Sequence, residues 1–440
     1  MNRSHTLAIL GVMGLATLAA LLWPRAHAPS PTTRSHGAEA SGDAPEIAAP
    51  VRDERTDLDR RIEAMRALAE RDGTWLDWEN VAALYVDRAD LGGGLEDLGL
   101  ADEALDRAFA VARPGVGPHA HRASLDFRLH RLDDCETMIE AIEGYGVMLA
   151  NDREVVTSLR SDLAFFRGEY AEARERYTQR NAGGADPVVL FALARLEWST
   201  GHGERAAQLL DQADAAAASE PGLHGFLALA RATFERDRGR LEEAARHASR
   251  AMSLRATHLD TVLLLAEVRL EQGELDAADA LVTRALAIDD APQAHELAAR
   301  IARTRGDAIA MEEHRSAATR AIEALYPRFP EAIAGHALLH FLRFEDEARA
   351  IEMAEVNARA RPFGEARARL ALAYLRAART EDAQREIEAV LATEWSTGES
   401  HAIAAEIFSA QSDARAQSER DLAEQLAPGA ADRVADLRRH

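Results

Sequence analysis

The stretch GRLEEAARHASRAMSL, residues 239–254, has a near copy in GELDAADALVTRALAI, residues 273–288. Each copy begins with a glycine, carries an alanine five residues later, and continues with small or apolar residues four and seven positions after that alanine. Spacings of this kind place the side chains on one stripe of a helix. Because the two glycines are 34 residues apart, the sequence predicts a repeated structural unit of that length.

The same pattern recurs along the chain. Its clearest copies begin at intervals of 33, 38, 34 and 33 residues, at Gly168, Gly201, Gly239, Gly273 and Gly306. We assign two further copies to it, one at Gly99 and one at Ala378, where alanine takes the place of glycine. A pair of apolar residues precedes most copies by about two helical turns, as Leu265 and Ala266 precede Gly273. Each unit is therefore expected to be a helix, a tight turn and a second helix.

These residue types at these offsets, closed by a proline such as Pro362, resemble the tetratricopeptide repeat family. The resemblance covers about residues 75–428, or about ten helix pairs, and the inserted LGGGLED at 91–97 interrupts it. It implies an all-α fold, a tetratricopeptide-like α-solenoid in which stacked helix-turn-helix repeats form a right-handed superhelix. One pair cannot cover its own apolar face, whereas stacked pairs bury a continuous core.

The composition agrees with helices packed on helices. Hydrophobic residues make up 47% of the chain but aromatic residues only 5%, so alanine and leucine must do most of the packing. With 74 acidic and 52 basic residues the net charge is −22, which disfavours nucleic acid as a partner. All basic residues are arginine, which excludes lysine-dependent chemistry such as Schiff bases. The single cysteine, Cys135, is expected to be a buried small side chain.

The N-terminal part predicts a different organisation. A short flank, 1–6, precedes the uncharged apolar run LAILGVMGLATLAALLW at 7–23, which is long enough for a membrane anchor or a signal sequence. We expect a disordered Pro/Ala/Ser-rich linker at 24–56, the repeat domain at 57–428 and a C-terminal tail at 429–440. The predicted localisation is membrane-anchored, with the repeat domain on the extracytoplasmic (periplasmic) side, or secreted after cleavage of the signal.

By resemblance to the family, the first helices of the pairs line a concave groove that binds a peptide or a helix of a partner protein. Aromatic and arginine side chains are typical anchors at such interfaces. The alternative is a purely structural role, in which the rings fill seams between repeats and the arginines pair with the many carboxylates. The candidate partner-binding residues are Phe165, Phe166, Phe191, Arg195, Trp198, Phe226, Arg236, Arg300 and Arg303, with Arg343 and Arg376 on the same inner surface.

The predicted function is a membrane-tethered, non-enzymatic adaptor without cofactor or metal, acting in envelope assembly or secretion. The main alternative is a structural solenoid that assembles with itself and has no separate client. A third hypothesis, a metal-dependent hydrolase, rests on His336 and His340, whose i, i+4 spacing suits zinc, although no third ligand is assigned. The repeated WSTG at 198–201 and 395–398 falls in different registers of the repeat and is interpreted as a coincidence.

Overall fold

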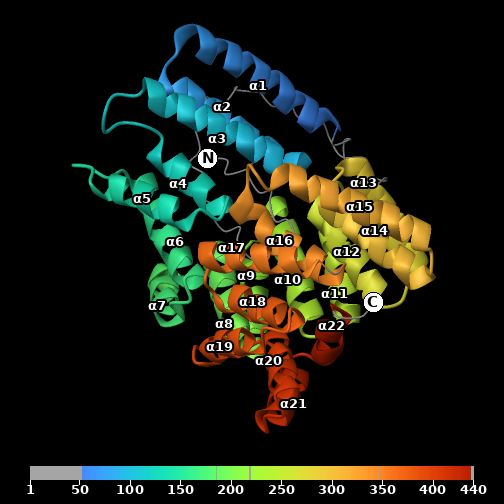
Figure 1. Cartoon of the computed structure of the whole chain (residues 1–440). Coiled ribbons are helices and arrows are strands. Elements are labelled where there is room, and N and C mark those ends of the chain that lie inside the picture. Colours follow the sequence, from blue (N-terminus) through green and yellow to red (C-terminus); the bar gives the residue numbers. More distant parts are fainter. Residues whose placement is uncertain (1–51, 185, 218–219, 345, 438–440) are drawn as a thin grey trace, which may run out of the picture.

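The structure, a computed structural model, describes residues 52–184, 186–217, 220–344 and 346–437. Over these residues the secondary structure is helical, without a β-strand. Ten antiparallel helix pairs of the described chain follow one another, and each packs against the next to form one curved array (Figure 1). The predicted all-α fold of stacked helix-turn-helix units is confirmed.

The bounds of the helices follow the repeat. The pairs are, in chain order, α2 (Trp75–Arg88) with α3 (Gly94–Val111), α4 (His119–Arg128) with α5 (Leu132–Glu143), α6 (Ala150–Phe166) with α7 (Tyr170–Arg180), α8 (Pro187–Ser199) with α9 (Gly203–Ala216), α10 (Pro221–Asp237) with α11 (Leu241–Leu254), α12 (Leu259–Glu271) with α13 (Leu275–Ile288), α14 (Pro292–Arg305) with α15 (Ala308–Leu325), α16 (Pro330–Arg343) with α17 (Glu347–Ala360), α18 (Gly364–Arg376) with α19 (Thr380–Leu391), and α20 (Gly398–Ala410) with α21 (Arg415–Leu426). Helix α1 (Arg52–Asp72) packs on α2, and α22 (Ala430–Asp436) packs on α20 and α21.

Helices extend beyond the predicted repeat domain at both ends. Helix α1 begins at Arg52 rather than near residue 57, and α22 lies inside the segment 429–440 that was expected to be a tail. The predicted flank at 1–6, the apolar run at 7–23 and most of the linker at 24–56 lie outside the described residues.

Alanine sets the distance between helices in the two repeats that contain residues 239–254 and 273–288. Ala244, Ala248 and Ala251 on α11 have no exposed surface, and neither do Ala278 and Ala285 on α13. A methyl group at these positions lets one helix axis approach another closely, and the small gaps that remain are filled by leucine and valine. The stripe read from the sequence is therefore the buried face of the second helix in each pair.

The turns inside the pairs use left-handed backbone. The five glycines that mark the repeat have φ between 71° and 82°, a region that glycine enters without steric cost. Ala378 occupies the equivalent position before α19 with φ 54°, so a residue with a Cβ is held there in a conformation that disfavours it.

The assignment of Gly99 as a turn of the repeat is wrong. Gly99 lies inside α3, and the turn before this helix is formed at Gly92, with φ 113°, and Gly94, with φ 56°. The inserted glycines supply the left-handed residues, so a short π-helical segment, η2 (Ala89–Gly93), joins α2 to α3. Gly99 serves packing instead, because a Cβ there would lie 2.6 Å from the ring of Phe329.

The array closes on itself, because its C-terminal third packs along the N-terminal half (Figure 1). We call the boundary between these two parts the closing seam. It begins where Phe329 packs against α3 and where the His130 ring meets the carbonyl oxygen of Glu331 at 3.1 Å. It ends where Pro428 contacts Gly239 and Arg433 donates to the carbonyl oxygen of Asp237 at 3.3 Å.

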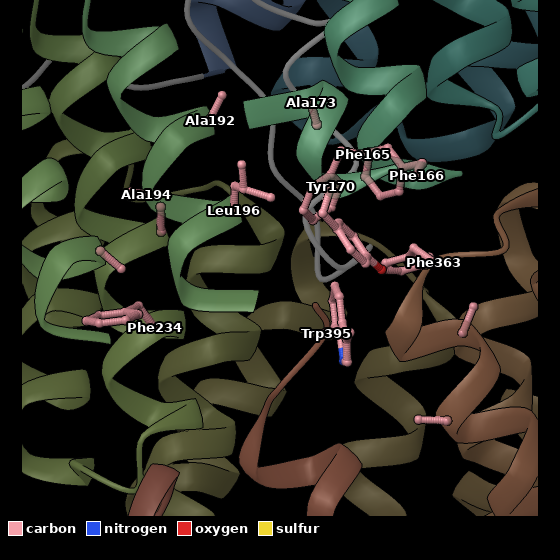
Figure 2. Close-up of a cluster of buried hydrophobic side chains, with 14 of the residues drawn as sticks. Phe165, Phe166, Tyr170, Ala173, Ala192, Ala194, Leu196, Phe234, Phe363 and Trp395 are labelled. Carbon is pink, nitrogen blue, oxygen red and sulfur yellow. The ribbon is translucent and has the colours of Figure 1, made fainter. Parts of the chain in front are cut away.

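An aromatic cluster fills the middle of the closing seam. Figure 2 shows Phe165 and Phe166, at the end of α6, facing Phe363 and Trp395 from the C-terminal part. The ring centroids of Phe166 and Phe363 are 5.2 Å apart, those of Tyr170 and Trp395 5.7 Å. Tyr170 also accepts a buried hydrogen bond of 2.8 Å from the Gly364 amide. Contacts of this kind add to the burial of apolar area, so the seam is a core and not a loose contact.

The two WSTG copies meet in the closing seam. The amide of Ser396 donates to the carbonyl oxygen of Ser199 at 2.9 Å, and the Ser396 side chain lies against Gly201. Arg174 pairs with Glu394 at 2.6 Å next to this contact. The copies differ in repeat register, but they are neighbours in the fold.

The structure corrects the predicted localisation. Among the residues that it describes, no helix is long and apolar enough to cross a lipid bilayer. This finding corrects the prediction of a membrane-anchored chain with an extracytoplasmic repeat domain. The apolar run at 7–23, on which that prediction was based, lies outside the described residues.

The left-handed turns give a matched pair of stability predictions. Replacing Ala378 with glycine removes the steric cost of its positive φ and should raise the free energy of unfolding by about 0.5–1 kcal/mol. Replacing Gly273 with alanine, at a turn with open space around the new Cβ, should lower it by about 1 kcal/mol for the opposite reason. Urea denaturation followed by circular dichroism measures both, and equal signs for the two variants would contradict the argument.

A second prediction concerns the closing seam. A Cβ at Gly364 would lie 2.0 Å from the Trp395 ring, so Gly364→Ala should displace the indole and loosen the contact between α6 and α18. We expect a red shift of tryptophan emission and a larger radius of gyration in solution scattering, with most helical signal retained. Gly146→Ala, where the new Cβ meets no atom within 4 Å, is the control. An unchanged radius of gyration in Gly364→Ala would show that the seam does not hold the array closed.

Candidate functional site

The first helices of successive pairs surround a central cavity. Its walls come from α8, α10, α12, α14, α16, α18 and the start of α20, and its volume is about 320 Å³. Helix α22 folds back from the end of the array and covers part of it, with Val434 and Leu437 on the wall. The cavity is what remains of the inner surface of the array after the closing seam has sealed the rest.

Four of the nine predicted partner-binding residues line this cavity. They are Phe191 and Trp198 on α8, Arg236 on α10 and Arg300 on α14. Phe191 packs edge to face on Phe226 behind it, with ring centroids 4.9 Å apart. The rings and guanidinium groups at the wall are the residue types that anchor protein partners.

The other five predicted residues do not line the cavity. Phe165, Phe166 and Phe226 are buried in the core, and Arg195 has no exposed surface. Arg303 lies over the ring of Phe344, with its guanidinium carbon 5.9 Å from the ring centroid. Of the further inner-surface arginines, Arg343 lines the cavity and Arg376 does not. The structure thus divides one predicted groove into a cavity and a sealed interior.

Arg195 belongs to a buried charge cluster. Its Nη2 atom lies 2.7 Å from Asp162 Oδ1 and 2.8 Å from Tyr177 Oη, and Tyr177 donates to the same carboxylate oxygen at 2.6 Å. All three residues are buried completely, and the guanidinium carbon lies 4.2 Å from the centre of the Phe165 ring. A charge at this depth is stable only with such partners, so the cluster fixes how α8 sits on α6 and α7.

One wall of the cavity carries a balanced ion-pair network. Glu267 on α12 accepts from Arg236 at 3.0 Å and from Arg300 at 2.9 Å. Arg236 also pairs with Glu271 at 2.7 Å, and Arg343 pairs with Glu296. Three guanidinium groups therefore face three carboxylates, and the guanidinium groups lower the pKa of the deeply placed Glu267 to about 2 against the opposing effect of burial.

The opposite wall, formed by α18, α20 and the end of α10, has one carboxylate that forms no ion pair with the described residues. Arg369 pairs with Glu365 at 2.5 Å and with both oxygens of Glu399, at 2.8 Å and 3.0 Å. The two hydrogen bonds of Arg433 go to main-chain oxygens of Pro428 and Asp237. The Asp237 carboxylate, which is exposed on the cavity wall, has no hydrogen bond or ion pair with any side chain of the described chain.

Sequence reasoning missed most of this second wall. Glu365, Arg369 and Glu399 lie on the first helices of their pairs, facing inward like Arg236 and Arg300, so helical periodicity could have placed them. Asp237 is the last residue of α10 and Trp395 lies in the connection between α19 and α20. Their positions depend on the closing seam, for which the repeat pattern gives no signal.

The two histidines that suggested a zinc site lie in different surroundings. His336 lines the cavity, and burial lowers its pKa to about 4, so the ring is neutral at neutral pH. His340 is buried, with Nε2 at 2.9 Å from Thr319 Oγ1. Within the described ranges no group of three His, Cys, Asp or Glu side chains is arranged to hold a metal ion.

Comparison with known families adds one decisive observation. Residues 235–301 match the tetratricopeptide repeat family. The match runs from the end of α10 through α11, α12 and α13 into α14. It includes both copies of the repeat at 239–254 and 273–288. The described chain as a whole has the tetratricopeptide-like α-solenoid architecture, in which adjacent helix pairs stack. No curated protein matches the chain by sequence.

Several solved helical-repeat structures can be superposed on the chain. They include the Rap conjugation gene regulator of the plasmid pLS20 in complex with the Phr* peptide, at 11% identity and a TM-score of 0.40, covering 82% of this chain and 96% of that one. The human IFIT1 dimer with PPP-AAAA has 12% identity and a TM-score of 0.38, with 85% and 94% covered. Yeast Tom70 has 14% identity and a TM-score of 0.38, with 88% and 93% covered. At these values none of them bears on the function of this chain.

The tetratricopeptide repeat supports a general function. Solenoids of stacked helix pairs present extended concave surfaces, and they serve as scaffolds for protein interactions. The lining and the size of the cavity determine which segment of a partner this chain can hold.

The buried charge cluster gives a prediction about stability. Arg195→Ala leaves the Asp162 charge buried without its guanidinium partner and should lower the free energy of unfolding by about 3–5 kcal/mol. Arg176→Ala, which breaks an exposed pair with Glu172, is the matched control and should cost less than about 1 kcal/mol. Equal losses in urea denaturation would show that the Arg195 cluster is not a structural element.

Proposed function

We propose that the chain is a non-enzymatic protein-interaction scaffold that holds a short, extended segment of a partner protein in its central cavity. The observation that carries this proposal is the lining of the cavity, to which α8 contributes the rings of Phe191 and Trp198, and α10 and α14 contribute the guanidinium groups of Arg236 and Arg300. Rings bury apolar side chains, and guanidinium groups bind carbonyl and carboxylate oxygens in defined directions.

The size of the cavity favours an extended segment over a helix. Its volume of about 320 Å³ is at the lower end of the range of ligand pockets, roughly 300–1,000 Å³. An α-helix with its side chains is roughly 10–12 Å wide, whereas an extended segment is narrower and places fewer atoms across the cavity. A few residues of extended chain, such as a terminus or a loop tip of the partner, fit without opening the closing seam.

The buried residues of the predicted groove have a supporting role in this proposal. Phe226 backs the Phe191 ring, and the cluster of Arg195, Phe165 and Phe166 fixes the helices that carry the wall. A site held by packed supports is preorganised, so a ligand loses less entropy by ordering it. Their substitution should therefore reduce stability first and binding only as a consequence.

A cavity-filling variant tests the proposal. Gln293 on α14 lines the cavity, and its side chain makes no hydrogen bond with the described residues, so Gln293→Trp should fill the space without breaking a pair. The probe is a phage-displayed library of random octapeptides selected on the full chain. We expect the wild type to enrich related sequences that bind the variant at least about tenfold more weakly, because the ring excludes them.

The control for this experiment is Gln208→Trp on the exposed face of α9, which adds the same ring outside the cavity. It should bind the enriched peptides as the wild type does. If no sequence family is enriched, or if both tryptophan variants bind equally well, the cavity is not the binding site. Thermal unfolding of all three proteins identifies any loss that comes from misfolding.

A further inference from the structure

The two walls of the cavity differ in how their carboxylates are paired. On the wall formed by α10, α12, α14 and α16 the carboxylates of Glu267, Glu271 and Glu296 each have a guanidinium partner, and Asp260 lies 3.6 Å from His258 Nε2. On the opposite wall Glu365 and Glu399 share Arg369, and the Asp237 carboxylate has no partner. The other two guanidinium groups on this side are engaged elsewhere, since Arg238 pairs with Glu204 at 2.7 Å and Arg433 donates to main-chain oxygens. The Asp237 carboxylate is therefore left without an ion pair in the described chain.

The electrostatics at Asp237 point in the same direction. Its deep position, together with repulsion by Glu399 and Glu365, raises the pKa of Asp237 to about 7, although Arg236 attracts the charged form. The raised pKa means that burial and the two like charges outweigh the attraction of Arg236 and Arg433 for the charged form of Asp237. A cation bound beside Asp237 would restore the charged form of its carboxylate. The free energy of binding gained there is therefore larger than beside a carboxylate that already has an ion pair.

An independent observation comes from Trp395, which borders the same wall. Its side chain is 3% exposed, and its Nε1 donor has no hydrogen-bond partner in the described chain. Tyr170, Phe165 and Phe363 pack against the indole and do not line the cavity, whereas Trp395 does. Figure 2 shows the indole nitrogen on the side of the ring that points away from Phe165 and Phe166. A buried N–H without an acceptor is costly and rare, which indicates an acceptor that a ligand supplies.

We infer that the wall of Asp237, Glu365 and Glu399 binds a protonated primary amine of the partner peptide, and that Trp395 donates to a carbonyl oxygen of the same peptide. This inference rests on the proposed function and specifies the chemistry of its ligand. A primary amine occurs in a peptide as the free N-terminus or as a lysine side chain, and either has backbone carbonyl groups nearby. The net charge of −22 favours the approach of a cationic segment over long distances.

The probe is a set of random tetrapeptides with amidated C-termini. It is prepared with free N-termini, with acetylated N-termini and no lysine, and with acetylated N-termini and one lysine. Affinity-selection mass spectrometry on the full chain compares the three. We expect peptides with a free N-terminus or a lysine to bind at least about tenfold more tightly than the acetylated set without lysine, because only they carry the charge.

The outcomes separate the two proposals. If the free and the lysine-free acetylated peptides bind equally well and Gln293→Trp abolishes both, the amine site is wrong and the scaffold proposal stands. If none of the peptides binds, the scaffold proposal itself fails. A preference for the N-terminus or for lysine identifies the source of the amine.

Two variants locate the site. Asp237→Asn keeps the shape and removes the charge, and it should weaken binding of the amine peptides at least about tenfold while thermal unfolding stays unchanged. Glu313→Gln, at an exposed carboxylate on α15 that forms no hydrogen bond or ion pair with the described residues, is the matched control and should have no effect. Trp395→Phe keeps an aromatic ring and removes the donor, so it should weaken binding severalfold. Unchanged affinity in Asp237→Asn would overturn the inference.

The pH dependence provides a second readout. Between pH 7.5 and 6 Asp237 gains a proton, so binding of the amine peptides should weaken as pH falls. The charged groups around it are Glu365, Glu399, Arg236, Arg369 and Arg433. His336, which also lines the cavity, stays neutral because its pKa is about 4. Asp237→Asn should lose this dependence, and a dependence that persists in the variant would contradict the assignment.

Discussion

The fold depends on the close contact between helices that alanine side chains permit. A pair of helices with a stripe of alanine and leucine has a small apolar face that it cannot cover alone, and the next pair provides the cover. This requirement produces the array: ten pairs in the described chain, each packed on its neighbour. It also explains how a protein with 5% aromatic residues buries extended hydrophobic clusters along the array.

The few aromatic residues are concentrated where the repeat alone gives no packing. Phe165, Phe166, Phe363 and Trp395 join parts of the array that are far apart in the sequence, and with them the curved array becomes closed. Closure converts most of the inner surface into core, and what remains open is a cavity with rings, guanidinium groups and carboxylates on its walls. The same contact therefore sets both the shape of the protein and the size of anything that it can hold.

The repeat could be read from the sequence because it is local. Spacings of three, four and seven residues, with glycine at the turns, report directly on a helix pair, and they placed Ala278, Gly273 and even Ala378 correctly. Only the assignment of Gly99 as a turn was wrong, since glycine inside a helix and glycine at a turn look alike in sequence. The closing seam could not be predicted, because a repeat pattern describes contacts between neighbouring helix pairs. It carries no information on contacts between pairs that are far apart in the sequence. For that reason Phe165 and Arg195 were expected in an open groove, whereas they lie in the core.

Closure has a consequence for how the chain folds. An open array of repeats can unfold one pair at a time, since each pair depends only on its neighbours. Here the Tyr170 hydroxyl and the Gly364 amide, 194 residues apart, form one buried hydrogen bond, and bringing them together requires the loss of chain entropy over all the intervening pairs. The last step of folding is thus a non-local one, and the frayed intermediates of a linear solenoid give way to a single transition that couples both ends of the chain.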